Sequence, residues 1–201
     1  MLIDHSRKFI FLRVPKTASS SIRTSLVPFV TDGFHVSCKD GGHVRRNIVN
    51  GSVIGVTHKT NMEQHANVAS AKETFGRVFY DYFSFTFIRN PWDRMVSWYF
   101  WDCHQNSYND SFEAWVDEVV FKTLQGNTRW RQDVYVDVDF IGRFESLRED
   151  LSVVFCRFGL EVGDIPMEKS GIRPDVHYRD MFSKRQRDLV YENFNCFDYR
   201  Y

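Results

Sequence analysis

Two short apolar runs, each followed by polar residues and then by a helical stripe, stand out in the hydrophobic pattern of this chain. In the first, residues 9–14 are mostly aromatic or branched, which predicts a buried strand that Pro15 ends. Lys16 and a group of hydroxyl residues come next, and Ile22 and Leu26 then begin the stripe of a helix. The first run therefore predicts a strand, a tight loop and a helix N-terminus.

The second run, residues 82–88, alternates apolar and polar positions as a strand does, and it leads directly into Arg89. Asn90 belongs to the residue types that cap helices, and Pro91 suits the first helical position. Ser97 would lie two turns into this helix. We therefore expect an arginine at a strand tip and a nearby hydroxyl, which together can bind one anionic group.

The loop after the first strand has the chemistry of a phosphate site. A helix N-terminus offers unpaired backbone N–H groups and the positive end of the helix dipole, and Lys16 adds a full charge. Hydroxyl donors follow at Thr17, Ser19, Ser20 and Ser21. The loop is not a Walker A loop, because it contains no glycine ahead of the lysine. Taken alone, a serine-rich turn that caps an ordinary helix fits the same residues equally well.

The two segments together resemble the sulfotransferases that use 3′-phosphoadenosine 5′-phosphosulfate (PAPS), in particular the carbohydrate sulfotransferases. The order of the two motifs and their strand-loop-helix settings carry this likeness. A weaker likeness continues at residues 143–151 and near the C-terminus at residues 178–182, 190–194 and 197–199. The resemblance thus extends over nearly the whole chain.

This resemblance implies how the co-substrate is held. The Pro-Lys-Thr loop would bind the 5′-phosphosulfate, while Arg89 and the serine eight residues later, Ser97, would bind the 3′-phosphate. Residues 169–173 resemble the loop that closes over the nucleotide, so Arg173 would be a further contact of the 3′-phosphate. The resemblance assigns the co-substrate to Lys16, Thr17, Ala18, Ser19, Ser20, Ser21, Arg89, Ser97 and Arg173.

A histidine is the predicted general base. Residues 51–58 predict a short buried strand that ends at His58, and ligands of an open parallel sheet bind outside the carboxyl ends of its strands. His58 would then lie beside both motifs, where neutral imidazole can take the proton of an attacking hydroxyl. His65 and Glu63 are the alternatives. Lys16 is the second predicted catalytic residue, because its charge can stabilise the leaving oxygen.

Strands that alternate with helices predict the fold class. A chain of 201 residues, 43% hydrophobic and 16% aromatic, has room for one sizeable core, so a single domain over residues 1–201 is expected. The alternation predicts a three-layer, P-loop-like α/β fold with a mostly parallel central sheet flanked by helices. Residues 31–50, with three scattered glycines, are interpreted as a loop.

Charge and hydropathy limit the partners. Basic and acidic residues both number 26, so no global basic bias points to nucleic acid. The pair Arg45-Arg46 fits a solvated surface, although beside a cleft it could meet an acidic acceptor. No apolar run reaches about 18 residues and the N-terminus is charged, so we expect a soluble, cytoplasmic protein without a membrane anchor. Four cysteines lack metal-ligand spacing and are expected to be free thiols: Cys38, Cys103, Cys156 and Cys196.

The predicted function is transfer of the sulfuryl group of PAPS to a hydroxyl of an acceptor, a glycan or small molecule, by in-line displacement. No metal is expected, because a sulfuryl group carries less negative charge than a phosphoryl group and no aspartate stands beside the loop. Two alternatives are a P-loop kinase, which would need Mg²⁺ and ATP, and a non-catalytic module that binds a nucleotide. A kinase is disfavoured by the missing glycines.

Overall fold

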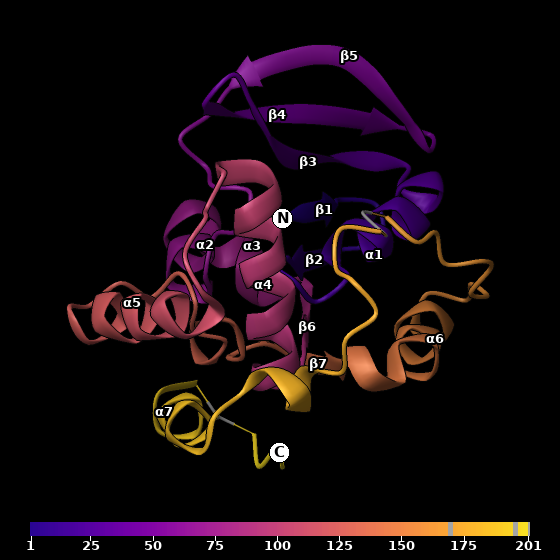
Figure 1. The fold of residues 1–201 in the computed structure, drawn as a ribbon. Helices are drawn as coiled ribbons and strands as arrows, with labels where there is room; N and C mark the ends of the chain where they lie inside the picture. Colours follow the sequence, from indigo (N-terminus) through magenta and orange to yellow (C-terminus); the bar gives the residue numbers. More distant parts are fainter. Residues whose placement is uncertain (169–170, 195–196, 201) are drawn as a thin grey trace. The chain divides into compact units, whose positions relative to one another are not determined.

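A computed structural model describes residues 1–168, 171–194 and 197–200, without the side chains of residues 55–58 (Figure 1). The chain forms two compact units. Unit 1 consists of Met1–Ile88 and Val134–Glu168, and unit 2 of Arg89–Asp133 and Lys169–Tyr201. The single domain expected over residues 1–201 stays a prediction.

Unit 1 is built on a seven-stranded sheet in the order β5-β4-β3-β1-β2-β6-β7, among the residues described. Only the pairs β2–β6 and β6–β7 are parallel, and the other four neighbouring pairs are antiparallel. The prediction of a mostly parallel sheet is therefore wrong, although the mixed α/β class is confirmed. The strands are β1 (Leu2–Asp4), β2 (Phe9–Leu12), β3 (Asp32–Lys39), β4 (Gly42–Val49), β5 (Ser52–Lys59), β6 (Phe83–Ile88) and β7 (Phe140–Arg143).

Two tight turns explain the antiparallel pairs β3–β4 and β4–β5. Residues 31–50 were expected to be a loop, but they form β3 and β4, which Asp40 and Gly41 join with φ of 49° and 75°. Asn50 and Gly51 join β4 to β5 with φ of 47° and 75°. Asp-Gly and Asn-Gly are the preferred pairs for such left-handed, two-residue hairpin turns. These dipeptides were the signal in the sequence that could have revealed the meander.

Helices cover both faces of this sheet. Ile22 of α1 and Phe155 of α6 pack with Phe11 and Phe85 on one face. Helices α2 and α3 pack on the other face, for example through Phe79. Successive side chains of the buried strands point to opposite faces of the sheet, so they contribute to two separate cores, one on each face. The helical segments are α1 (Ser19–Leu26), η1 (Val27–Phe29), α2 (Val68–Phe75), α3 (Arg77–Asp81), η2 (Asp133–Tyr135, at the boundary of the units), η3 (Phe144–Ser146) and α6 (Leu147–Arg157).

Unit 2 is helical over its described residues, and tryptophans dominate its core. Trp92, Trp98 and Trp115 are each at most 3% exposed and pack in one cluster. The hydroxyl of Ser111 accepts a hydrogen bond from the Ala114 backbone and so caps α5, as the sequence predicts. The described helices of unit 2 are α4 (Pro91–Asn106), α5 (Phe112–Leu124), η4 (Tyr178–Met181) and α7 (Lys184–Phe194).

Candidate functional site

The first motif has the predicted form of strand, loop and helix N-terminus. Strand β2 ends at Leu12, and α1 begins at Ser19. Lys16 and Ala18 both have a left-handed backbone, with φ of 68° and 56°. No side chain caps α1, and no acidic residue lies in its first turn. The first N–H groups of α1 are therefore not used by a cap, which is the arrangement an anion needs.

Hydroxyl groups of the loop and of the first turn of α1 also hold this segment in shape. The buried Thr17 donates from Oγ1 to the Val14 carbonyl at 3.0 Å. Ser21 accepts at Oγ from the backbone N–H of Glu168 at 3.2 Å, and Ser20 accepts at Oγ from Arg13 Nη2 at 3.2 Å. The predicted row of donors is thus partly structural, since these three side chains have partners within unit 1.

Strand β6, which leads into the second motif, is the parallel neighbour of β2. Thr86 of β6 donates from Oγ1 to the Leu12 carbonyl at 2.9 Å, and both residues are fully buried. The strands that precede the two motifs are therefore fixed side by side in unit 1, with Leu12 opposite Thr86 in the register. Arg89 follows the last residue of β6 and is the first residue of unit 2.

Within unit 2 the backbone of Arg89 is clamped by a buried side chain. Gln132 Oε1 accepts from the Arg89 N–H at 2.9 Å, and Gln132 Nε2 donates to the Arg89 carbonyl at 2.8 Å. Asn90 accepts hydrogen bonds from the backbone of Trp92 and Asp93, which confirms the predicted cap of α4 with Pro91 at its start. Gln132 was not identified from the sequence, because nothing local marks a contact over 43 residues.

An acidic residue brings two of the predicted 3′-phosphate residues together. Asp93 Oδ2 lies 2.7 Å from Arg89 Nη2, and its Oδ1 lies 2.5 Å from Arg173 Nη1. Burial acts to raise the pKa of the Asp93 carboxyl, but the charges and hydrogen bonds of both arginines outweigh burial, so the pKa is lowered. Ser97 is half-buried one turn further along α4 and shares a helix face with Asp93. Lys169 and Ser170 of the same predicted loop lie outside the described residues.

His58 lies far across the sheet from the first motif. His58 belongs to β5, an edge strand four positions from β2, and lies opposite Arg45 of β4. At about 4.8 Å per strand, this separation is roughly 19 Å. The interpretation of residues 51–58 as a buried strand is also wrong at its start, because Ser52, Val53 and Ile54 are exposed. The His58 side chain lies outside the described part of the structure.

His65, the predicted alternative, lies next to the first motif. Its Nδ1 is 2.6 Å from the Arg13 carbonyl, and its own carbonyl accepts from the Tyr135 hydroxyl at 2.9 Å. A carbonyl only accepts, so Nδ1 carries the hydrogen and Nε2 holds the lone pair. Gln64 Nε2 lies 2.9 Å from His65 Nε2, while Gln64 Oε1 accepts from the Cys38 backbone. The imidazole is therefore held in one tautomer.

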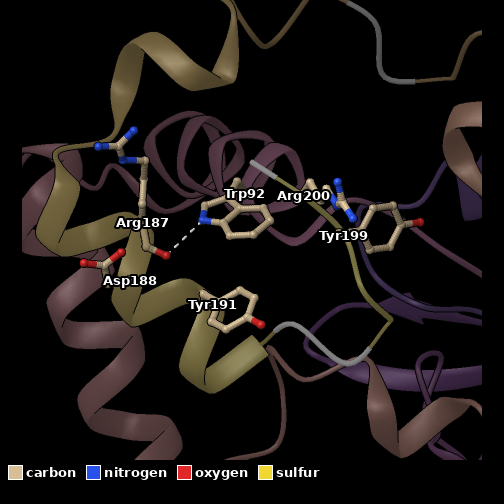
Figure 2. A pocket seen from close by; sticks show the side chains of 6 residues that line it. All are labelled: Trp92, Arg187, Asp188, Tyr191, Tyr199 and Arg200. Carbon is tan, nitrogen blue, oxygen red and sulfur yellow. Dashed lines mark hydrogen bonds between the residues drawn. The ribbon is translucent and has the colours of Figure 1, made fainter.

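A shallow pocket in unit 2 holds none of the predicted site residues. Figure 2 shows the stacked rings of Trp92 and Tyr191, whose centroids are 6.4 Å apart, and the hydrogen bond from Trp92 Nε1 to the Arg187 carbonyl. Since Trp92 is only 2% exposed, most of its ring belongs to the core. The pocket is lined by Trp92, Arg187, Asp188, Tyr191, Tyr199 and Arg200.

The described residues contain neither a cluster of metal ligands nor a helix that could span a membrane. No three histidine, cysteine or acidic side chains gather there in a way that could hold a metal ion. No helix in this part of the chain has both the length and the apolar character needed to cross a bilayer. Three described cysteines are free thiols: Cys38, Cys103 and Cys156. Cys196 lies outside the described residues.

Comparison with known proteins assigns this chain to a class of group-transferring enzymes, the sulfotransferases. The chain matches the Sulfotransferase family over residues 1–200 and therefore belongs to that family. It is 34% identical over 91 residues to an uncharacterized protein of Archaeoglobus fulgidus, covering 42% of this chain and 73% of that protein. No solved structure matches the chain significantly. Membership implies a nucleotide sulfate donor and a hydroxyl-bearing acceptor.

Proposed function

We propose that this protein transfers the sulfuryl group of PAPS to a hydroxyl of a carbohydrate acceptor. The observation that carries the proposal is the uncapped N-terminus of α1, which follows the Pro-Lys-Thr turn in a chain that belongs to the Sulfotransferase family. The 5′-phosphosulfate is bound by Lys16 and the N–H groups of Ser19, Ser20 and Ser21. The pairing of Arg89 and Arg173 on one carboxylate supports their assignment to the 3′-phosphate.

The reaction is an in-line displacement at sulfur. The acceptor oxygen forms a bond to sulfur while the bond from sulfur to the bridging oxygen breaks, and adenosine 3′,5′-bisphosphate departs with the electron pair. Negative charge grows on the bridging oxygen, where Lys16 stabilises it more strongly than in the bound ground state. The hydroxyl proton passes to a general base. Protein side chains and backbone N–H groups supply this stabilisation, and no metal is part of the proposal.

Of the two histidines considered, His65 has the better-supported geometry for the base. Its hydrogen bond to the Arg13 carbonyl leaves Nε2 as the proton acceptor. The same bond holds the imidazole against Arg13, which precedes Lys16 by three residues. Gln64 occupies Nε2 and must move away when an acceptor binds. His58 is the competing choice, but β5 lies four positions from β2, roughly 19 Å, whereas the base must come within hydrogen-bond reach of the hydroxyl that attacks sulfur beside Lys16.

The proposal is tested with labelled PAPS and a panel of glycans, sugars and small alcohols, with products identified by mass spectrometry. We expect a sulfate ester on a carbohydrate hydroxyl, formed equally well in EDTA. Heat stabilisation by adenosine 3′,5′-bisphosphate should far exceed that by AMP or by ATP without metal. Equal stabilisation by ATP that depends on Mg²⁺ would indicate a kinase instead. Nucleotide binding without any product from the panel would indicate a binding module.

A further inference from the structure

Asp93 offers one carboxylate oxygen to each of the two arginines assigned to the 3′-phosphate. Arg89 donates from Nε to Oδ2 at 2.8 Å, and its Nη2 lies 2.7 Å from the same oxygen. Arg173 donates from Nη1 to Oδ1 at 2.5 Å. The side chains of Arg89, Asp93 and Arg173 are 11%, 18% and 23% exposed, so water and salt screen these contacts less than at an open surface. All three residues belong to unit 2.

The backbone of Arg89 is fixed without the help of Asp93. Its N–H and its carbonyl are both hydrogen-bonded to the buried Gln132 side chain, at 2.9 and 2.8 Å. Arg89 also lies between the last residue of β6 and Asn90, the cap of α4. Asp93 therefore orients the Arg89 guanidinium, but it does not determine where this residue lies.

Arg173, by contrast, lies in a segment without helix or strand, residues 171–177. Within the described chain, residues 171–176 take part in two side-chain hydrogen bonds, and Arg173 donates both of them. One goes to the Val176 carbonyl at 2.7 Å and closes the segment on itself. The other goes to Asp93 on α4. Asp93 is therefore the side chain through which this loop is hydrogen-bonded to the helix of the second motif.

Electrostatics gives Asp93 a role before any nucleotide binds. Two guanidinium groups that are to meet one phosphate repel each other, and a carboxylate between them offsets that repulsion. Burial raises the pKa of the Asp93 carboxyl, but the charge of Arg89 and the hydrogen bonds from both arginines outweigh burial, so the pKa is lowered and the group is charged near neutral pH. Without this carboxylate, charge repulsion and the conformational entropy of the loop would both favour movement of Arg173 away from Arg89.

We propose that Asp93 is a positioning residue, which brings Arg173 beside Arg89 before the nucleotide binds so that both guanidinium groups meet the 3′-phosphate together. This inference rests on the proposed function, which assigns the 3′-phosphate to these arginines. Asp93 has the same sign of charge as a phosphate, so it acts through Arg173 and is not itself a ligand. Because the loop is ordered in advance, nucleotide binding does not have to supply the free energy of ordering it. Asp93 thus determines how strongly the enzyme prefers a nucleotide that carries a 3′-phosphate.

Calorimetry measures this preference as the ratio of the Kd of AMP to the Kd of adenosine 3′,5′-bisphosphate. Asp93→Asn keeps the size of the side chain and removes its charge. It should lower the ratio by about 10- to 100-fold, the loss expected for one charge-assisted hydrogen bond from Arg173. Asp93→Glu keeps the carboxylate but displaces it by one methylene, and it should recover part of the ratio. Asp117→Asn is the matched control, because the exposed pair of Asp117 with Arg185 lies in the same unit and its loss should leave the ratio unchanged.

A double-mutant cycle with Arg173→Ala shows whether Asp93 acts through Arg173. The variant that carries both Asp93→Asn and Arg173→Ala should lose about as much of the ratio as Arg173→Ala alone, because both changes remove the same contact. Pulse-labelled hydrogen exchange without nucleotide is the second readout: both single variants should exchange the amides of residues 171–176 faster than the parent. A merely structural role of Asp93 in the first turn of α4 would instead speed exchange in α4 and leave the ratio unchanged. If Asp93→Asn does not fold, the cycle is run with Asp93→Glu, which should lower the ratio in the parent and not in Arg173→Ala.

The outcomes separate this inference from the proposed function. Losses that multiply in the double variant would mean that Asp93 acts independently of Arg173, and the inference would be wrong. Tighter binding of the bisphosphate by Asp93→Asn would also overturn it, because the carboxylate would then compete with the phosphate. A parent that binds AMP and the bisphosphate equally well would refute the proposed 3′-phosphate site itself. A parent with the preference and a folded Asp93→Asn protein that retains it would refute the positioning role alone.

Discussion

Replacing Arg89 by alanine tests the proposed 3′-phosphate site most directly. The guanidinium is held by Asp93, with exposed fractions of only 11% and 18% for the two side chains. Loss of a charge-assisted hydrogen bond to the phosphate should cost about 1.5–3 kcal/mol, which is a 10- to 100-fold rise in Kd. Asp93 keeps Arg173 as a partner, so the free energy of unfolding should fall by about 1–3 kcal/mol rather than more.

The measurement compares adenosine 3′,5′-bisphosphate with AMP by calorimetry, for the parent and for Arg89→Ala. AMP lacks the 3′-phosphate, so its weaker binding should be the same in both proteins. Arg185→Ala is the control, because Arg185 forms an exposed pair with Asp117 at 2.7 Å within the same unit. This variant should bind both nucleotides like the parent. A folded Arg89→Ala protein that still prefers the bisphosphate over AMP as strongly as the parent would refute the placement of the 3′-phosphate.

Three further predictions follow from the site. Lys16→Ala should weaken PAPS binding and also lower turnover, because one ammonium contacts both the bound donor and the leaving oxygen; steady-state kinetics showing loss of only one would contradict this. His65→Ala should keep nucleotide affinity and lower turnover about 10²- to 10⁴-fold, whereas a full rate in His65→Ala and a similar loss in His58→Ala would assign the base to His58. The lowered pKa of Asp93 means that its stabilising effect is complete above the ordinary value of 3.8 and is lost as the pH falls through the lower folded-state pKa. Urea unfolding of Asp93→Asn should therefore show a weaker decline of stability between about pH 5 and pH 2 than the parent, and equal declines would rule out this coupling.

Features that depend on short stretches of chain were determined by the sequence itself. The apolar run that Pro15 ends became β2, and Asn90 with Pro91 became the start of α4, because caps and turns use groups only a few residues apart. The two motifs also sufficed to indicate the Sulfotransferase family, to which the chain belongs. Even the hairpins of β3 to β5 are encoded locally, in Asp40-Gly41 and Asn50-Gly51.

Tertiary structure alone decided which distant side chains meet. Asp93 and Arg173 are 80 residues apart, and His65 contacts the Arg13 carbonyl over 52 residues. The mixed sheet likewise depends on the short strand β1, whose three residues give no periodic signal but separate β2 from β3. Hydrophobic periodicity indicates which face of a helix or strand is buried. It does not indicate which element packs against that face, or whether a neighbouring strand is parallel or antiparallel. The burial of Arg13 and the contact of Arg89 and Arg173 with the same carboxylate, Asp93, arise from such non-local contacts, so the fold rather than the local sequence set them.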